Sequence, residues 1–149
     1  MSIARYLFLD DRSIKSSSNV SLKLGRVYKH PKNPLMIEDQ TWEQRYDNFY
    51  GNIIYDQAEE LFKCWYSPFI VANSSIGMSY DDRQNKEYEG HENQEMGICY
   101  ATSKDGFSWD KPDLNLVDFN GNRSNNIVFR GPHGSGIYYD DATASDKAR

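Results

Sequence analysis

The chain of 149 residues is long enough to form one domain with a hydrophobic core. Its formal net charge is -5 and its basic residues form no run, which argues against nucleic acid as a partner, and no apolar stretch is long enough to cross a membrane. Aromatic residues make up 14% of the chain; this favours a β-rich domain, whose pleated surfaces pack rings, and suits a protein that binds carbohydrate, because rings stack on the apolar faces of sugars.

The N-terminal part of the chain predicts two strands. Residues 5–11 (RYLFLDD) form a short apolar run, and residues 19–30 alternate Val20, Leu22 and Leu24 with polar residues, as a strand with one solvated face does. The opening residues lack the length and the cleavage pattern of a signal peptide. We therefore expect the chain as written to be cytoplasmic, an expectation that a missing upstream segment would reverse.

The middle of the chain predicts an antiparallel sheet within a single domain spanning 1–149. The prolines of residues 30–36 favour an extended or turning segment, and residues 40–51 have the weak periodicity of a loop. Residues 70–95 carry few apolar anchors and are expected to be a long polar insertion loop. The sequence predicts four strands in meander order at 51–56, 61–69, 96–103 and 112–119, and the start of another sheet at 126–130 and 134–142.

The cysteine and histidine residues do not indicate a metal site. Cys64 and Cys99 match no metal-ligand spacing, and neither do the three histidines, so we predict no metal and no cofactor. Both cysteines lie in apolar strand patterns, which predicts buried free thiols. A disulfide between them would require that their strands are neighbours.

The segment SKDGFSW (103–109) predicts a tight turn after the third strand. The carboxylate of Asp105 is suited to accept backbone N–H groups of the turn, and Gly106 can adopt a positive φ. Trp109 is expected to fold beneath the hairpin and cover its apolar side. Since each residue has a structural role, we do not expect Asp105 to be catalytic.

This turn, within ATSKDGFSWDKP (101–112), resembles the third-strand turn of the five-bladed β-propeller glycosidases, which include β-fructosidase-like, arabinanase-like and β-mannoside-phosphorylase-like enzymes. KHPKNPLM (29–36) resembles the entry to the first blade of these enzymes, and YGNIIYDQAEELFKCWYSPF (50–69) resembles the first two strands of that blade. The resemblance covers most of residues 28–142. It implies an all-β fold that is the N-terminal portion of a β-propeller: one complete four-stranded blade, an N-terminal arm and the start of a second blade.

The resemblance also implies where catalytic carboxylates lie. Asp47 occupies nearly the place of the family's aspartate before the innermost strand of blade one, although the proline that follows it in the family is absent. Asp141 resembles the aspartate that orients or stabilises the sugar, without the arginine and proline that surround it in the family. The family's general acid, a glutamate of a later blade, is expected beyond Arg149. Glu43 is expected at the surface or in contact with substrate.

These residues suggest a protein that acts on carbohydrate. We expect part of a glycoside hydrolase, or a phosphorylase, that acts on poly- or oligosaccharides, with Asp47 as nucleophile or base. A non-catalytic carbohydrate-binding propeller is the alternative, which the unusual surroundings of both aspartates favour. A third reading is an inactive truncated fragment that self-associates through exposed blade edges. The expected sugar contacts are Trp42, Arg45, Asn48, Tyr50 and His133.

Overall fold

The computed structural model describes residues 10–87 and 93–138. The chain forms two compact units, which divide between Pro31 and Lys32. In the first unit, a short 3-10 helix, η1, spans Asp11–Ser13, and the side chain of Asp10 caps it by accepting a hydrogen bond from the backbone N–H of Arg12. The predicted strand at 5–11 lies mostly outside the described residues.

The predicted strand at 19–30 is wrong. None of these residues belongs to a strand, and the alternating Val20, Leu22 and Leu24 are exposed. A strand needs a neighbour for its backbone hydrogen bonds, and an alternating pattern selects a buried face only where another element covers that face. Among the described residues of the first unit, no strand is available to pair with this segment.

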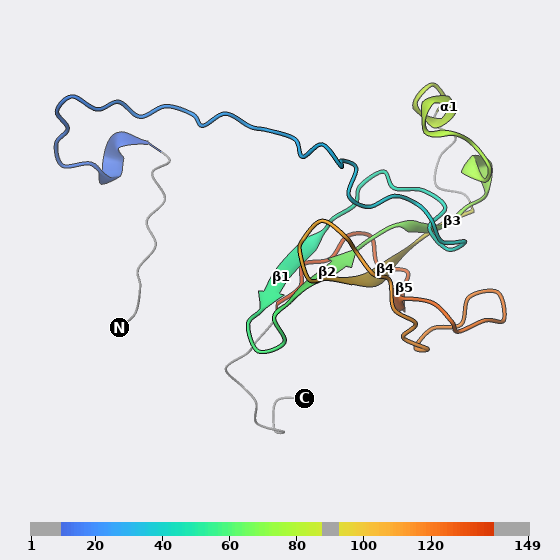
Figure 1. The fold of residues 1–149 in the computed structure, drawn as a ribbon. Coiled ribbons are helices and arrows are strands. Elements are labelled where there is room, and N and C mark those ends of the chain that lie inside the picture. The colour runs from blue at the N-terminus through green and yellow to red at the C-terminus, as the bar shows by residue number, and fades with distance from the viewer. Residues whose placement is uncertain (1–9, 88–92, 139–149) are drawn as a thin grey trace. The chain divides into compact units, whose positions relative to one another are not determined.

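The second unit is built on a five-stranded antiparallel sheet with almost no helix (Figure 1). The prediction of an all-β fold is confirmed at this level; the described residues contain one sheet, and it does not close into a propeller. None of the helices in the described ranges has the length and apolar character needed to traverse a bilayer. The strands are β1 (Asn52–Asp56), β2 (Leu61–Tyr66), β3 (Phe69–Ala72), β4 (Gln94–Ser103) and β5 (Ile127–Arg130).

The long strand β4 organises the sheet. Along one edge its first residues pair with β3 and its last residues pair with β2, and β1 pairs with the outer edge of β2. Cys99 pairs with Tyr66 of β2 and also with Ile127 of β5, so β5 must lie on the opposite edge of β4. β2 and β3 therefore run as one interrupted strand, and the sheet has the order of a four-stranded meander.

The predicted fourth strand at 112–119 is wrong, and Ile127–Arg130 takes its place. Within 112–119, the only β pairing is the isolated bridge between Phe119 and Asn122. β5 instead follows two buried asparagines, whose side chains fix the position where the strand begins. The Asn125 Oδ1 accepts a hydrogen bond from the Ile127 N–H, and the Asn126 Nδ2 donates to the Tyr100 carbonyl of β4. Residues 126–130 thus complete this sheet and do not open another one.

The region 70–95 is not one long loop, contrary to the prediction. It contains most of β3, the 3-10 helix η2 (Asn73–Ser75), the short helix α1 (Tyr80–Gln84) and the start of β4. Ile70 and Ala72 of β3 are fully buried, and this apolar pair anchors the segment in the sheet. Residues 88–92 lie outside the described part of the chain.

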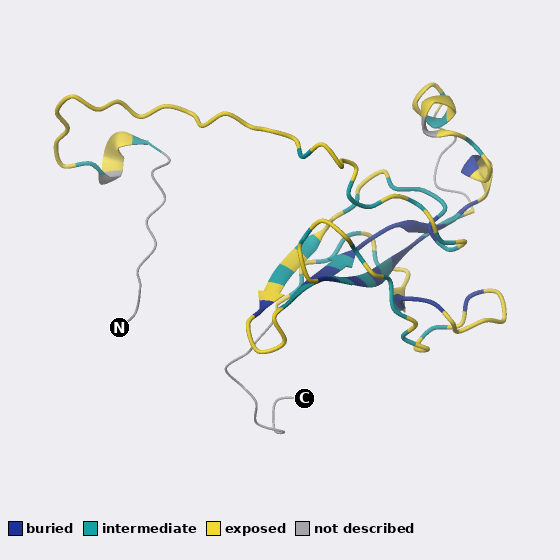
Figure 2. Cartoon of the chain, in the orientation of Figure 1, coloured by how far each residue is buried: buried dark blue, intermediate teal, exposed yellow. Residues whose placement is uncertain are grey.

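Most buried residues of the sheet lie on β2, β3 and β4 (Figure 2), and the main core cluster lies on one face of the sheet. The alternation of β2 and β4 directs Cys64, Tyr66, Cys99 and Ala101 to this face, where all four are fully buried. The segment before β1 and the segment after the Asp105 turn pack over them; their partly buried hydrophobic residues are Met36, Trp42, Tyr46, Phe49, Trp109 and Val117.

Both cysteines are buried free thiols, as predicted. β2 and β4 are neighbours, and Cys64 lies opposite Ala101 while Cys99 lies opposite Tyr66. The cysteines are therefore diagonal across the strand pair, where Cα atoms are roughly 7–8 Å apart, too far for a disulfide without movement of the backbone.

The turn after β4 has the predicted construction. Asp105 Oδ1 accepts hydrogen bonds from the backbone N–H groups of Phe107 at 2.8 Å and Ser108 at 2.7 Å, and Gly106 has a φ of 74°. These bonds, with that of Ser108 the strongest, lower the pKa of Asp105 to about 2. Trp109 packs against the core cluster, so the turn is a structural element.

Candidate functional site

The segment that carries Asp47 is bonded to the junction between β2 and β3. On one side of Asp47, the Arg45 carbonyl accepts a hydrogen bond from the Phe69 N–H at 2.9 Å, and on the other the Phe49 carbonyl accepts one from the Ser67 N–H at 2.8 Å. The chain has to leave the regular ladder at this junction because Pro68 has no N–H. Asp47 is therefore held at the end of the sheet where β1 begins.

Asp47 and Arg45, both predicted as site residues, form an ion pair. Arg45 Nη2 lies 2.7 Å from Asp47 Oδ2, and the side chains are 15% and 46% exposed respectively. The guanidinium carbon of Arg45 lies 4.3 Å from the centroid of the Phe69 ring, and its Nη1 donates to the hydroxyl of Ser75 at 3.2 Å. The buried Arg45 Nε has no hydrogen-bond partner. Arg45 is thus fixed by three contacts, and it orients a carboxylate that stays half exposed.

A polar cavity of about 150 Å³ opens beside this ion pair. Arg83 of α1 is held at its wall because its Nη2 lies 3.0 Å from Glu38 and its Nη1 donates to the Gln44 carbonyl. Both donors and acceptors line the cavity, which suits a ligand rich in hydroxyl groups. The lining residues are Arg45, Tyr46, Asp47, Ser74, Ser75, Arg83, Gln84, Lys86, Glu87 and Gln94.

Sequence reasoning missed the contributions of α1 and of the start of β4 to this cavity. A local signal for the helix was present: Ser79 precedes α1, and its hydroxyl accepts a hydrogen bond from the Asp82 N–H, as an N-cap does. A Ser followed three residues later by an acidic residue marks such a start. Nothing local indicated that Arg83 and Gln94 would line the same cavity as Asp47.

Tyr50 and His133, two further predicted contacts, lie against each other. Their ring centroids are 5.8 Å apart in an edge-on arrangement. The carboxamide of Asn52 holds the two chain segments together: its Nδ2 donates to the carbonyls of Tyr50 and Ser135 at 2.9 and 2.8 Å, and its Oδ1 accepts from the Ile137 N–H at 3.2 Å. Asn52 therefore fixes both rings beside the first residue of β1.

The other predicted site residues belong to neither the Arg45–Asp47 pair nor the Tyr50–His133 pair in the part of the chain that the structure describes. Trp42 donates its indole N–H to Asn126 Oδ1 at 2.6 Å and lines a different cavity. Asn48 is exposed and lines none of the cavities described here. Asp141 lies outside the described residues, so its predicted role stays a prediction.

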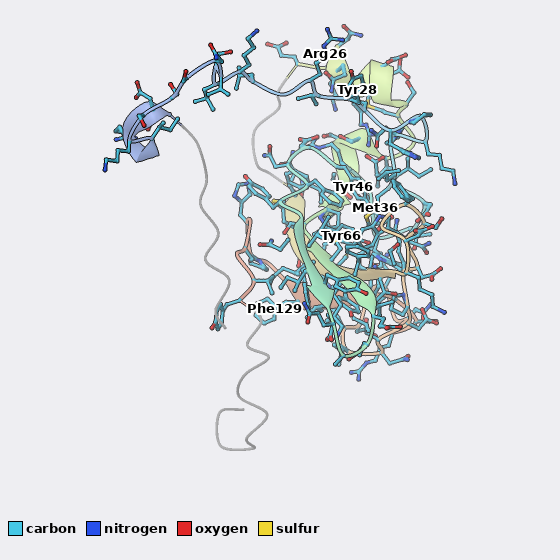
Figure 3. All side chains as sticks on the ribbon, turned by 60° about the vertical axis from the view of Figure 1, so that its left-hand side comes forward. Arg26, Tyr28, Met36, Tyr46, Tyr66 and Phe129 are labelled. Atoms are coloured by element: carbon cyan, nitrogen blue, oxygen red, sulfur yellow. The ribbon has the colours of Figure 1, made fainter. Side chains whose placement is uncertain are left out.

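Glu43 is not at the surface, contrary to the prediction. Its side chain has 0% exposure, and Lys111 Nζ lies 2.6 Å from its Oε2. The Tyr66 hydroxyl donates to its Oε1 at 2.5 Å, and Tyr66 packs edge-on against Tyr46 in the core (Figure 3). Burial, with the charge of Glu43 as a further cause, raises the pKa of Tyr46 and of Tyr66. Glu43 thus belongs to a buried structural network.

No group of three or more His, Cys, Asp or Glu residues is arranged to hold a metal ion within the described part of the chain. No family model, curated protein or solved structure matches this chain. Its function therefore has to be inferred from the chemistry of the site.

Proposed function

We propose that this chain is part of a carbohydrate-active protein of the glycoside hydrolase type, and that its sheet is one blade of a β-propeller. The observation that carries the proposal is the half-exposed carboxylate of Asp47, oriented by Arg45 at the mouth of a polar cavity. A sugar hydroxyl both donates and accepts hydrogen bonds, and this cavity offers both kinds of partner.

The position of Asp47 in the sheet supports the proposal. The residue comes just before β1, an edge strand of the meander, and the resemblance to propeller glycosidases expects the first catalytic aspartate just before the innermost strand of blade one, which is also an edge strand. The same resemblance expects a four-stranded meander, and the order of pairing has that form. In this arrangement Asp47 would act as nucleophile or base on the anomeric carbon, and a second carboxylic acid would protonate the leaving group.

A non-catalytic carbohydrate-binding role is the second candidate. The observation that favours it is the short ion pair between Arg45 and Asp47. A carboxylate that attacks an anomeric carbon has to leave such a partner or share it with the substrate. A carboxylate that only accepts hydrogen bonds from sugar hydroxyls can keep it.

The variant Asp47→Asn tests both candidates, since it keeps the shape of the side chain and removes its charge. We would screen neutral and acidic oligosaccharides for binding to this chain by calorimetry, and for hydrolysis by the whole protein of which this chain is proposed to be part, since cleavage needs the second carboxylic acid. A catalytic role predicts that hydrolysis falls by at least about a hundredfold while binding persists. A binding role predicts no turnover and a dissociation constant raised about tenfold.

The matched control is Asp110→Asn, the same chemical change at an exposed aspartate beside the far end of β4. It should leave turnover and binding unchanged. If no oligosaccharide is bound by the unmodified chain or hydrolysed by the whole protein, both candidates fail.

A further inference from the structure

A second cavity lies apart from the Asp47 site. It has a volume of about 140 Å³ and shares no lining residue with the cavity beside Asp47. No charged side chain lines it: the residues are Thr41, Trp42, Phe119, Asn120, Asn122, Ser124 and Asn125.

One wall is a tryptophan with a fixed orientation. The indole N–H of Trp42 donates to Asn126 Oδ1 at 2.6 Å, and the Nδ2 of the fully buried Asn126 donates in turn to the Tyr66 hydroxyl and the Tyr100 carbonyl. The polar edge of the indole is therefore turned into the protein and already bonded. What this ring offers to the cavity is apolar surface.

A tight hairpin forms another part of the lining. Phe119 and Asn122 exchange two backbone hydrogen bonds, and the intervening Asn120 and Gly121 have φ values of 53° and 80°. Two successive positive φ values define a type I′ turn, for which Asn-Gly is the preferred sequence. This rigid turn presents the side chains of Asn120 and Asn122 at the rim, where both residues are exposed.

The carboxamides at the rim are available to a ligand. Asn125 uses its side chain fully, since its Nδ2 donates to two carbonyls and its Oδ1 accepts from the Ile127 N–H. Asn122 Oδ1 accepts from the Ser124 N–H. Among the described residues, no hydrogen bond is made by the carboxamide of Asn120 or by Asn122 Nδ2.

We propose that this cavity binds one sugar ring of a neutral saccharide, with the apolar face of the ring on Trp42 and its hydroxyls on the Asn120 and Asn122 carboxamides. A carboxamide donates and accepts at once, as a sugar hydroxyl does, and the uncharged lining offers no opposite charge to an acidic or cationic ligand. The proposed role is binding alone, since no carboxylate, histidine, cysteine or lysine is among the residues that line the cavity. It does not depend on the role proposed for Asp47.

The test is a titration of the isotope-labelled chain with neutral gluco-, xylo- and manno-oligosaccharides, and with an oligogalacturonate as the acidic counterpart. NMR would follow the side-chain amides of Asn120 and Asn122 and the indole N–H of Trp42. We expect saturable shifts of these signals with at least one neutral saccharide and none with the oligogalacturonate. Asp47→Asn should not change the dissociation constant measured from them.

The decisive variant is Asn120→Gly, because glycine keeps the positive φ of the turn and removes only the carboxamide. It should weaken binding about five- to tenfold. Asn115→Gly is the matched control, since Asn115 is also exposed with a φ of 58° but lies outside the cavity. Trp42→Ala is avoided as the sole test because it would break the bond to Asn126 in the core.

Three results would overturn the proposal: no neutral saccharide shifts the three signals, the oligogalacturonate shifts them equally, or Asn120→Gly binds as tightly as the unmodified chain. Shifts confined to residues around Asp47 are a case of the first result, and they would support the separate proposal for that site.

Discussion

Lys111 Nζ lies 2.6 Å from the Oε2 of Glu43, although 68 positions separate the two residues in the chain. The same ammonium group donates to Asp39 Oδ1 at 2.7 Å and to the Ile37 carbonyl at 2.9 Å. This relationship joins the segment that precedes β1 to the segment that follows the Asp105 turn. Both segments cover the same face of the sheet, and the ion pair links them to each other above the core.

Lys111→Met should therefore destabilise the fold strongly. The substitution leaves the fully buried carboxylate of Glu43 without its cation, and breaking a buried pair by removing one partner costs about 3–5 kcal/mol. The free energy of unfolding in urea measures the loss. Lys104→Met, at an exposed lysine of the neighbouring turn, should stay within about 0.5 kcal/mol. Equal effects of the two substitutions would show that the buried pair contributes little.

The turn at Asp105 should make stability depend on pH in acid. The pKa of Asp105 falls from its ordinary value of 3.8 to about 2 because the N–H groups of Ser108 and Phe107 bind the carboxylate. A lowered pKa in the folded state means that the stabilisation is fully present above about pH 4 and is lost as the pH falls towards 2. The difference in urea midpoint between the unmodified chain and Asp105→Asn should shrink over this range.

Asp110→Asn serves as the control for that experiment, since the exposed Asp110 side chain accepts no bond within the turn. Its difference from the unmodified chain should stay constant between pH 5 and pH 2. A constant difference for Asp105→Asn as well would contradict the role given to the turn.

Asn52 should hold residues 135–137 against the start of β1. Its Oδ1 accepts the Ile137 N–H and its Nδ2 donates to the Ser135 carbonyl, so Asn52→Ala frees both backbone groups. We expect amide hydrogen exchange at Ile137 to accelerate about fivefold, and the contact between the Tyr50 and His133 rings to weaken. Asn48→Ala, at an exposed asparagine without such bonds in the described residues, should leave exchange at Ile137 unchanged. An unchanged rate in Asn52→Ala would exclude this role.

The two thiols should be unreactive in the folded chain. Burial raises the pKa of Cys64 to about 12 and also raises that of Cys99, so almost no thiolate exists near neutral pH. Labelling with a disulfide reagent at pH 8 should proceed only as fast as the protein unfolds, and urea should accelerate it. Rapid labelling of either cysteine without denaturant would contradict their burial.

The candidate site could be predicted in part. Arg45 and Asp47 are near neighbours in the sequence, and their pairing needed little more than a turn that brings them together. Tyr50 and His133 were assigned to the same site, and their rings do meet, but through Asn52, a residue with no local signal for that role. Trp42 was assigned to this site as well, yet it contacts Asn126 and faces the second cavity.

What the sequence by itself determined is local: the turn at Asp105, the hairpin of β1 and β2, and the buried thiols on the inward positions of β2 and β4. These features depend on backbone hydrogen bonds within a few residues and on the two-residue alternation of a strand. Only the tertiary structure decided that Ile127–Arg130 and not 112–119 pairs with β4, and that Glu43 is buried beside Lys111. Short segments have similar β propensities, so propensity alone does not decide which of them forms a strand. That depends on interactions with distant parts of the chain: a free strand edge, a buried amide or an opposite charge.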